Sequence, residues 1–324
     1  MPDYHIFGGV LRSVLEFPEL AEAASGTPTW WLTKRDEAPS RAGLELLGTA
    51  EVTPAASVSL SQAADGLQVA FDDTGLFAVS ADGCHITWTP PRQPDMDAVR
   101  RDILGRVFAV SLHQQGVVTL HGSAVDLDGQ AIAFLAPKYH GKSTTAAALV
   151  DSGATLLADD IVAVTTDGSP RVLPSVPTIL LWQDSAARVA QEAVPLREDD
   201  GVRKLQVRWR ENHRTPARTT PLAAIYLLAP LPPDGPQEAR REELPAVLAT
   251  VALLGQTKIG SMLGVKGRAR VLHQLGDVTA HAPVFRLQIP RDFGRLEELT
   301  GTIWSWHQPD RPRRPTREPS RHGE

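Results

Sequence analysis

The sequence predicts a mixed α/β protein in which a small β-rich module precedes a larger α/β domain. Three observations lead to this expectation. Residues 1–95 contain short runs with partial alternation of apolar and polar side chains, which is typical of strands. Residues 131–163 read as a strand, a turn, a helix and a second strand that ends on two aspartates. A length of 324 residues is enough for one large domain or two modest ones.

Composition narrows the class of protein. Hydrophobic residues make up 42% of the chain, an ordinary globular value. The net charge of −5 does not match nucleic acid as a partner. Cys84 is the single cysteine, so a disulfide framework within the chain is excluded. The first residues lack the pattern of a signal peptide, and no apolar run approaches the roughly 20 residues of a membrane span. We therefore expect a cytoplasmic protein with no membrane contact.

The β-rich module is expected over residues 1–95. Its strand signals are separated by Gly, Asp and Pro, and a proline-containing break follows at residues 90–97. The second domain is expected over residues 96–306. Residues 307–324 have almost nothing to bury and are expected to be a disordered tail.

The second domain begins with a helical pattern over residues 95–115, for which either Asp95 or Asp97 suits the N-cap. Further elements follow in order: a hairpin over 117–137 around Asp128-Gly129, a helix over 143–153, a strand pair over 154–174 around Asp167-Gly168, a buried strand over 222–230, a helix over 244–255, and a strand and a helix over 284–306. Residues 174–220 show a less regular pattern.

The turn between the first strand and the helix matches a phosphate-binding pattern at its end. The pattern is G-x-x-x-x-G-K-[ST], and here Gly141, Lys142 and Ser143 match while Ala136 replaces the first glycine. Backbone N–H groups at such a turn converge on phosphate oxygens. Lys142 would neutralise the terminal phosphates, and the Ser143 hydroxyl would face Mg²⁺. The candidate nucleotide-binding residues are Ala136, Pro137, Lys138, Tyr139, His140, Gly141, Lys142, Ser143 and Thr144.

Two acidic residues end the strand that follows the helix. Asp159 and Asp160 come after an apolar run, so we expect them at a strand tip that faces the turn. Phosphoryl transfer needs acids to hold a metal and to take the proton of the attacking hydroxyl. A solvated turn pair is the structural alternative. His121 ends another strand and is either catalytic or a structural histidine.

These residues together resemble a known family. The segments LHGSAV (120–125), GKST (141–144) and LLADDIVAV (156–164) are similar to the kinase domain of HPr kinase/phosphorylases, and within that family to the branch that modifies peptides, including lasso-peptide precursor kinases. The resemblance implies a P-loop fold like that of phosphoenolpyruvate carboxykinases. It implies transfer of phosphate from ATP with Mg²⁺ to a serine or threonine hydroxyl, and it allows a homo-oligomer.

The resemblance also implies residue roles. Asp159 is expected as the catalytic base, with His121 and Lys142 as further catalytic residues, and Ser143 and Asp160 as metal ligands. The acceptor is expected to be a peptide or small protein. Two other functions stay open: a kinase of small-molecule hydroxyls, and a non-catalytic nucleotide-binding protein with a degenerate turn.

Overall fold

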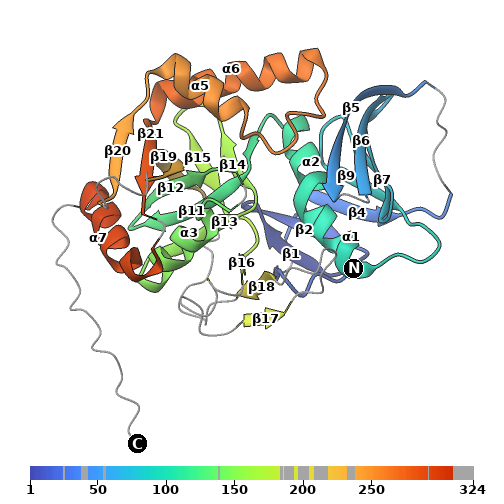
Figure 1. Cartoon of the computed structure of the whole chain (residues 1–324). Helices are drawn as coiled ribbons and strands as arrows, with labels where there is room; N and C mark the ends of the chain where they lie inside the picture. Colours follow the sequence, from blue (N-terminus) through green and yellow to red (C-terminus); the bar gives the residue numbers. More distant parts are fainter. Residues whose placement is uncertain are drawn as a thin grey trace, which may run out of the picture.

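The computed structural model describes residues 1–24, 26–37, 43–53, 56–137, 139–182, 185, 193–195, 204–207, 218–231, 238–290 and 292–308. Within these residues the chain is a mixed α/β protein with two large β-sheets (Figure 1). The two sheets share a hydrophobic core, which also includes the helical segment that connects them along the chain.

The first sheet is formed by the N-terminal strands, as the alternating patterns predict. Its strand order is β3-β1-β2-β4-β9-β8-β7-β6-β5. The strands are β1 (Asp3–Ile6), β2 (Gly9–Ser13), β3 (Ala21–Glu22), β4 (Trp30–Lys34), β5 (Glu45–Thr53), β6 (Ala56–Ala63), β7 (Gly66–Phe71), β8 (Gly75–Ser80) and β9 (His85–Thr89). From β5 to β9, neighbouring strands are antiparallel, and short turns join β6 to β7, β7 to β8 and β8 to β9. The domain boundary near residue 95 stays a prediction.

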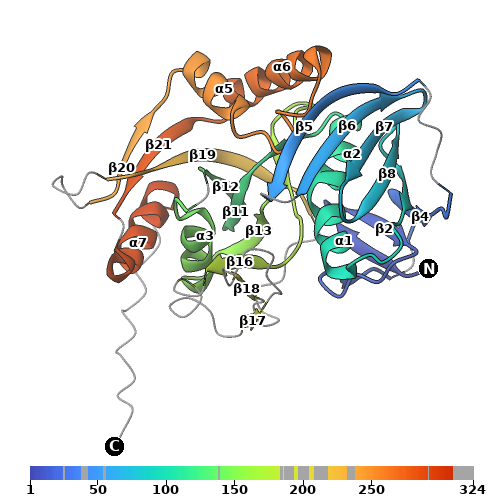
Figure 2. The same ribbon diagram turned by 45° about the vertical axis from the view of Figure 1, so that its right-hand side comes forward.

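A helical segment follows the first sheet. It consists of α1 (Met96–Asp102), the π-helical turn η1 (Ile103–Val107) and α2 (Phe108–Gln114). Asp95 is the N-cap, since its side chain accepts a hydrogen bond from the Asp97 N–H at 2.9 Å. In both ribbon views α1 and α2 lie beside the blue strands of the N-terminal sheet (Figures 1 and 2). Phe108 packs against Phe7 and Trp30 of the N-terminal module.

The second sheet has the order β10-β14-β15-β19-β12-β11-β13, with β21 also paired to β19 and β20 paired to β21. Its strands are β10 (Val118–Leu120), β11 (Gly122–Leu127), β12 (Gln130–Leu135), β13 (Thr155–Asp159), β14 (Val162–Thr165), β15 (Arg171–Leu173), β19 (Thr220–Pro230), β20 (Arg240–Glu243) and β21 (Val284–Ile289). The strands β12, β19 and β21 run parallel. A separate small sheet pairs β16 (Ile179–Trp182), β18 (Lys204–Val207) and β17 (Ala193–Pro195).

Helices cover both faces of the second sheet. Along β12, Ile132 and Phe134 pack with α3 (Lys142–Asp151) and α7 (Leu296–His307), while Ala133 and Leu135 belong to the core on the other face, which includes α5 (Ala246–Leu254) and α6 (Val265–His281). This alternation is the two-residue period of a strand buried on both faces. Figures 1 and 2 show α3 and α7 together on one side, and α5 and α6 on the other.

Three details differ from the sequence-based prediction. The first strand of the hairpin over 117–137 is interrupted at His121, so that β10 pairs with β14 and β11 pairs with β12. The segment over 154–174 forms three strands instead of a pair, because the chain changes direction after β13. The last helix includes His307, whose Nε2 lies 2.8 Å from Tyr226 Oη, so the tail cannot begin at residue 307.

Residues 309–324 of the predicted tail lie outside the described residues. The helix α6, which has 17 residues, was not predicted from the sequence. Within the part of the chain that the structure describes, none of the helices is both long and apolar enough to span a membrane.

Candidate functional site

The turn between β12 and α3 forms one wall of the site. Gly141 is the N-cap of α3 and has a φ of 85°, a left-handed conformation that favours glycine. Because glycine has no side chain to cap the helix, the first N–H groups of α3 are open to an anion. Ala136 is buried and is not among the residues with positive φ, so its methyl group fits where the phosphate-binding pattern has glycine.

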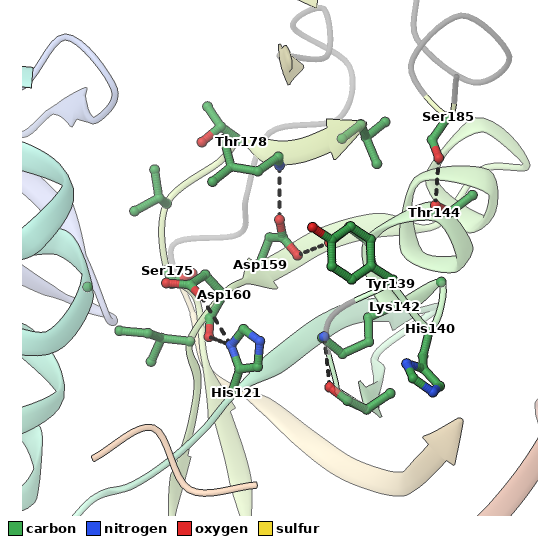
Figure 3. Close-up of a pocket in the computed structure, with 18 of the residues that line it drawn as sticks. His121, Tyr139, His140, Lys142, Thr144, Asp159, Asp160, Ser175, Thr178 and Ser185 are labelled. Carbon is green, nitrogen blue, oxygen red and sulfur yellow. Dashed lines mark hydrogen bonds and ion pairs between the residues drawn. The ribbon is translucent and has the colours of Figure 1, made fainter. Parts of the chain in front are cut away.

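Lys142 is held across this turn. Its side chain is buried, and Nζ donates hydrogen bonds to the carbonyl oxygens of Ala136 at 2.8 Å and Pro137 at 3.2 Å. The ammonium group therefore stands within the turn that an anion would enter. Tyr139 and His140 line the same pocket, Tyr139 with a φ of 68° and an exposed side chain (Figure 3). Thr144 Oγ1 lies 3.1 Å from Ser185 Oγ, and Lys138 lies outside the described residues.

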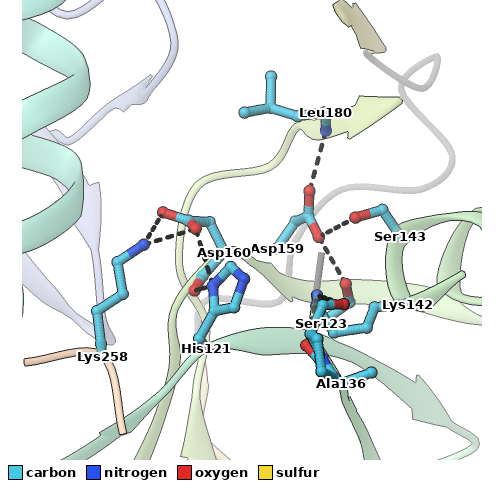
Figure 4. A network of polar contacts seen from close by, with 10 residues as sticks. His121, Ser123, Ala136, Lys142, Ser143, Asp159, Asp160, Leu180 and Lys258 are labelled. Atoms are coloured by element: carbon cyan, nitrogen blue, oxygen red, sulfur yellow. Dashed lines mark hydrogen bonds and ion pairs between the residues drawn. The ribbon is translucent and has the colours of Figure 1, made fainter. Parts of the chain in front are cut away.

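Asp159 ends β13 beside the turn. One carboxylate oxygen accepts hydrogen bonds from Ser123 Oγ at 2.6 Å and Ser143 Oγ at 2.9 Å, and the other accepts from the Leu180 N–H at 2.9 Å (Figure 4). Burial raises the pKa of Asp159, and the nearby charge of Asp160 acts in the same direction, against the lowering effect of the hydrogen bonds. A raised pKa makes this carboxylate a stronger proton acceptor.

Asp160 makes a different set of contacts. Lys258 Nζ donates to both carboxylate oxygens at 2.6 Å, and His121 Nδ1 lies 3.2 Å from Asp160 Oδ1 (Figure 4). Burial by itself would raise the pKa of Asp160. The Lys258 ammonium and His121 nevertheless hold this pKa well below its ordinary value. The Asp160 side chain keeps 41% exposure. It is thus an ionised carboxylate that is open to the pocket.

The Nδ1 atom of His121 faces two oxygen atoms. Besides Asp160 Oδ1, it lies 3.3 Å from the Asp160 carbonyl oxygen. Since both oxygens are acceptors, Nδ1 carries the proton, and Nε2 is the acceptor in the neutral ring.

Backbone pairing fixes His121 and Lys258 side by side. The His121 N–H donates to the Gln256 carbonyl at 2.7 Å, and the Lys258 N–H donates to the Thr119 carbonyl at 2.9 Å. Sequence reasoning did not find Lys258, because no local motif marks it. It also did not find Ser123, which lies two residues after His121 within the quoted LHGSAV segment and could have been noted as a polar residue beside the acids.

One cavity connects these groups. A pocket of about 1280 Å³ is lined by His121, Lys142, Ser143, Asp159 and Asp160 together with residues of α1 and η1. Figure 3 shows the turn residues and the two aspartates around it. The structure thus brings the sequence-predicted side chains to a common space. Ser143 contacts Asp159, and no hydrogen bond joins it to Asp160 among the contacts of the described residues.

A magnesium ion needs oxygen ligands, and the pocket contains several. Among the described residues, no group of three or more His, Cys, Asp or Glu side chains has the spacing of a protein-only metal site. Mg²⁺ usually takes one or two protein oxygen ligands and completes its shell with water and substrate phosphates. The Ser143 hydroxyl and the ionised Asp160 carboxylate are oxygen donors of this kind, so the residues fit Mg²⁺ bound together with a triphosphate.

Comparisons with known proteins give little further guidance. No protein-family model matches the chain, and no curated protein matches it. Among solved structures, the chain is similar to the Hpr(Ser) kinase/phosphatase from Coxiella burnetii, with 10% sequence identity and a TM-score of 0.30. The match covers 58% of this chain and 95% of the other.

Proposed function

We propose that the chain is an ATP-dependent kinase that transfers the γ-phosphoryl group to a serine or threonine hydroxyl of a peptide or small protein, such as a ribosomally made natural-product precursor. The observation that carries the proposal is the meeting of Lys142, Ser143 and the acid pair Asp159–Asp160 in one cavity. Phosphoryl transfer requires a cation at the phosphates and carboxylates at the attacking hydroxyl, and this cavity contains both.

Each residue receives a role from its surroundings. The α3 N-terminus and Lys142 bind the triphosphate, and the ammonium exchanges its carbonyl contacts at Ala136 and Pro137 for phosphate oxygens. Asp159, whose pKa is raised, takes the proton of the acceptor hydroxyl. His121 orients Asp160 through the Nδ1 contact.

The reaction balances as a direct transfer. The acceptor oxygen forms a bond to the γ-phosphorus, the bond from the γ-phosphorus to the bridging oxygen breaks, and ADP leaves with that oxygen. The hydroxyl proton passes to Asp159. Positioning and charge neutralisation in a preformed site supply most of the rate enhancement in such a reaction.

Ser143 Oγ and Asp160 are the residues that would hold Mg²⁺. When bound, the ion neutralises charge on the β- and γ-phosphates. The low pKa of Asp160 keeps its carboxylate ionised for this role. Lys258 shares the same carboxylate and therefore adds a second positive charge near the transferred group.

Substitution of the proposed base tests the function. Purified chain is incubated with [γ-³²P]ATP, Mg²⁺ and serine-containing peptides, and ATP affinity is measured separately by calorimetry. We expect Asp159→Asn to lower transfer by about 10²–10⁴-fold, the usual contribution of a general base, with ATP affinity largely retained. Ser143→Ala leaves the acid pair in place but removes a proposed Mg²⁺ ligand. It should therefore raise the Mg²⁺ concentration that half-maximal transfer requires.

Three outcomes separate the candidate functions. Tight ATP binding without label transfer to any hydroxyl supports a non-catalytic nucleotide-binding protein, which the replacement of glycine by Ala136 motivates. Transfer to small alcohols alone supports a small-molecule kinase. Full transfer by Asp159→Asn shows that Asp159 is not the base.

A further inference from the structure

The pocket has more room than a nucleotide requires. Its volume of about 1280 Å³ exceeds the roughly 300–1,000 Å³ of common ligand sites. Beyond the turn and the acid pair, one part of the wall is formed by Asp95 and by residues of α1 and η1 as far as Arg106. In Figure 4 this helical segment, in teal, lies on the side of Asp160 and Lys258, whereas α3 with Ser143 lies on the opposite side. We call the space along Asp95–Arg106 the α1 lobe.

Gly105 places the wall of the α1 lobe directly against the acid pair. It lies in the π-helical turn, with a φ of −93° and a ψ of −108° that no regular helix has. A Cβ atom added at Gly105 would meet only one heavy atom within 4 Å, Asp160 Oδ2 at 4.0 Å. This distance is ordinary van der Waals contact, so the missing side chain of the buried Gly105 leaves a narrow opening, the width of one small side-chain group, between the helix backbone and the carboxylate. Single π-helical turns within α-helices often occur at functional sites.

Three residues that line the pocket carry a buried polar atom without a hydrogen-bond partner among the described residues: Thr145 Oγ1 on α3, and, outside the turn and the helix that follows it, Glu19 Oε2 and Ser175 Oγ. Glu19 is fixed beside α1, because its other carboxylate oxygen accepts from Arg100 Nε at 3.0 Å. Ser175 is only 4% exposed, and Figure 3 shows it on the Asp160 side of the pocket. Buried polar atoms are rarely left unpaired, so a bound ligand with both donors and acceptors is expected here.

The length of the lobe indicates the kind of ligand. At about 1.5 Å per residue, the wall from Asp95 to Arg106 runs for roughly 15 Å. This length accommodates about five residues of an extended chain at about 3.3 Å each. Peptide N–H and C=O groups are the donors and acceptors that Glu19 Oε2 and Ser175 Oγ lack. A small alcohol would fill only part of this length.

We propose that the α1 lobe binds the acceptor as an extended peptide segment, whose hydroxyl reaches the site through the opening between Gly105 and Asp160. This inference rests on the proposed kinase function, since it names the acceptor's path to the same acid pair. Glu19 and Ser175 bind the peptide backbone on either side of the hydroxyl-bearing residue.

The test closes the opening by substitution. The probe is a pool of 13-residue peptides with a fixed central serine, used with [γ-³²P]ATP, and free serine is the small-alcohol probe. We expect Gly105→Leu to lower transfer to the peptides at least 10-fold through a higher peptide KM, with ATP affinity within about twofold of the wild type. Ser175→Ala should raise the peptide KM in the same direction.

Gly276→Leu is the matched control. Gly276 lies in α6, away from the pocket, and nothing lies within 4 Å of an added Cβ atom. Unchanged peptide KM in both Gly105→Leu and Ser175→Ala overturns the proposed path. Labelling of free serine as efficiently as the peptides overturns the extended acceptor but leaves the kinase function standing.

A binding measurement separates failure of the path from failure of the kinase function. A photo-cross-linking amino acid in place of Leu104, which lines the lobe, reports peptide binding without transfer. If Ser175→Ala weakens the cross-linking of a peptide, the lobe is supported as a peptide site, even when no labelled phosphate is transferred. If ATP binds, no label moves and no peptide cross-links, both proposals are overturned.

Discussion

At the scale of single residues, the site depends on an ion pair between distant parts of the chain. Lys258 and Asp160 are 98 positions apart, and a short backbone pairing beside β10 brings the lysine to the acid. The lysine side chain keeps 11% exposure, against 41% for the aspartate. The pair is thus buried at the lysine and open to the pocket at the carboxylate, where a substrate or metal ion can reach it.

Replacement of Lys258 should change the pH dependence of the proposed phosphoryl transfer. The pKa of Asp160 is depressed in the fold, so its ionised form adds stability above the ordinary carboxyl pKa, and this stability is lost as the pH falls through the folded pKa. In Lys258→Met the pKa of Asp160 rises, and we expect the acidic limb of the pH–rate profile to move to higher pH.

Chemical denaturation checks the same variant. A buried pair that loses one partner costs about 3–5 kcal/mol, and the exposure of Asp160 reduces our expectation to about 1–2 kcal/mol at pH 7. Lys258→Arg retains the charge and serves as the control. An acidic limb that stays in place in Lys258→Met contradicts the role of the ion pair.

Site residues that belong to a local sequence pattern could be predicted, whereas a site residue without such a pattern could not. Lys142, Ser143, Asp159 and Asp160 follow strand and helix patterns that can be read locally, and the structure places them around one pocket. Lys258 could not be predicted, because it is fixed by backbone pairing with a strand far away in the sequence.

At the scale of elements, the start of α1 is set by a single side chain. The sequence left Asp95 and Asp97 as alternatives for the N-cap, and the structure shows that Asp95 takes this position. Asp97 lies in the first turn of α1 and forms an ion pair with Arg100 instead. The cap supports the helix along which the proposed peptide lobe runs.

Removal of the N-cap should destabilise the segment. We expect Asp95→Ala to lower the free energy of unfolding by about 1 kcal/mol, since the hydrogen bond to the Asp97 N–H is lost. Asp97→Ala removes only an exposed ion pair, so its effect should stay below that of Asp95→Ala. Urea titrations of the two variants measure the difference. Equal losses would show that Asp95 does not cap α1.

The helix α6 shows where pattern reading fails for an element. Its buried residues Val271, Gln274, Leu275 and Val278 have helical spacing. One of the four is polar, and the glycines at 267 and 276 lower the helix propensity. Packing of this face against the rest of the core stabilises a helix that the local sequence only weakly favours.

At the scale of the whole molecule, the N-terminal sheet is tied to the helical wall of the pocket. Thr74, in the turn between β7 and β8, donates a hydrogen bond from Oγ1 to Asp102 Oδ2 of α1 at 2.7 Å. The Trp88 indole N–H, from β9, donates to the Thr74 carbonyl at 3.0 Å. Through these contacts the sheet supports the helix that forms the pocket wall, so the N-terminal module is part of the architecture of the site.

This junction should make the stability of the molecule depend on pH. Burial raises the pKa of Asp102 to about 6 from the ordinary value of 3.8, so the fold favours the protonated form. Protonated Asp102 therefore makes its full contribution to stability below the ordinary pKa, and this contribution is lost as the pH rises to about 6 and beyond. At 1.36 kcal/mol per pKa unit, the loss is roughly 3 kcal/mol at most.

Asp102→Asn should remove this dependence, because the amide oxygen still accepts from Thr74 and carries no charge. We expect the variant to match the wild type near pH 4 and to exceed its free energy of unfolding by roughly 2–3 kcal/mol at pH 7.5, measured by urea titration at several pH values. Thr74→Val removes a hydrogen bond that holds the pKa down, so it should destabilise the protein more at pH 7.5 than at pH 4. A difference between Asp102→Asn and the wild type that stays constant with pH would show that Asp102 titrates alike in the folded and unfolded chains.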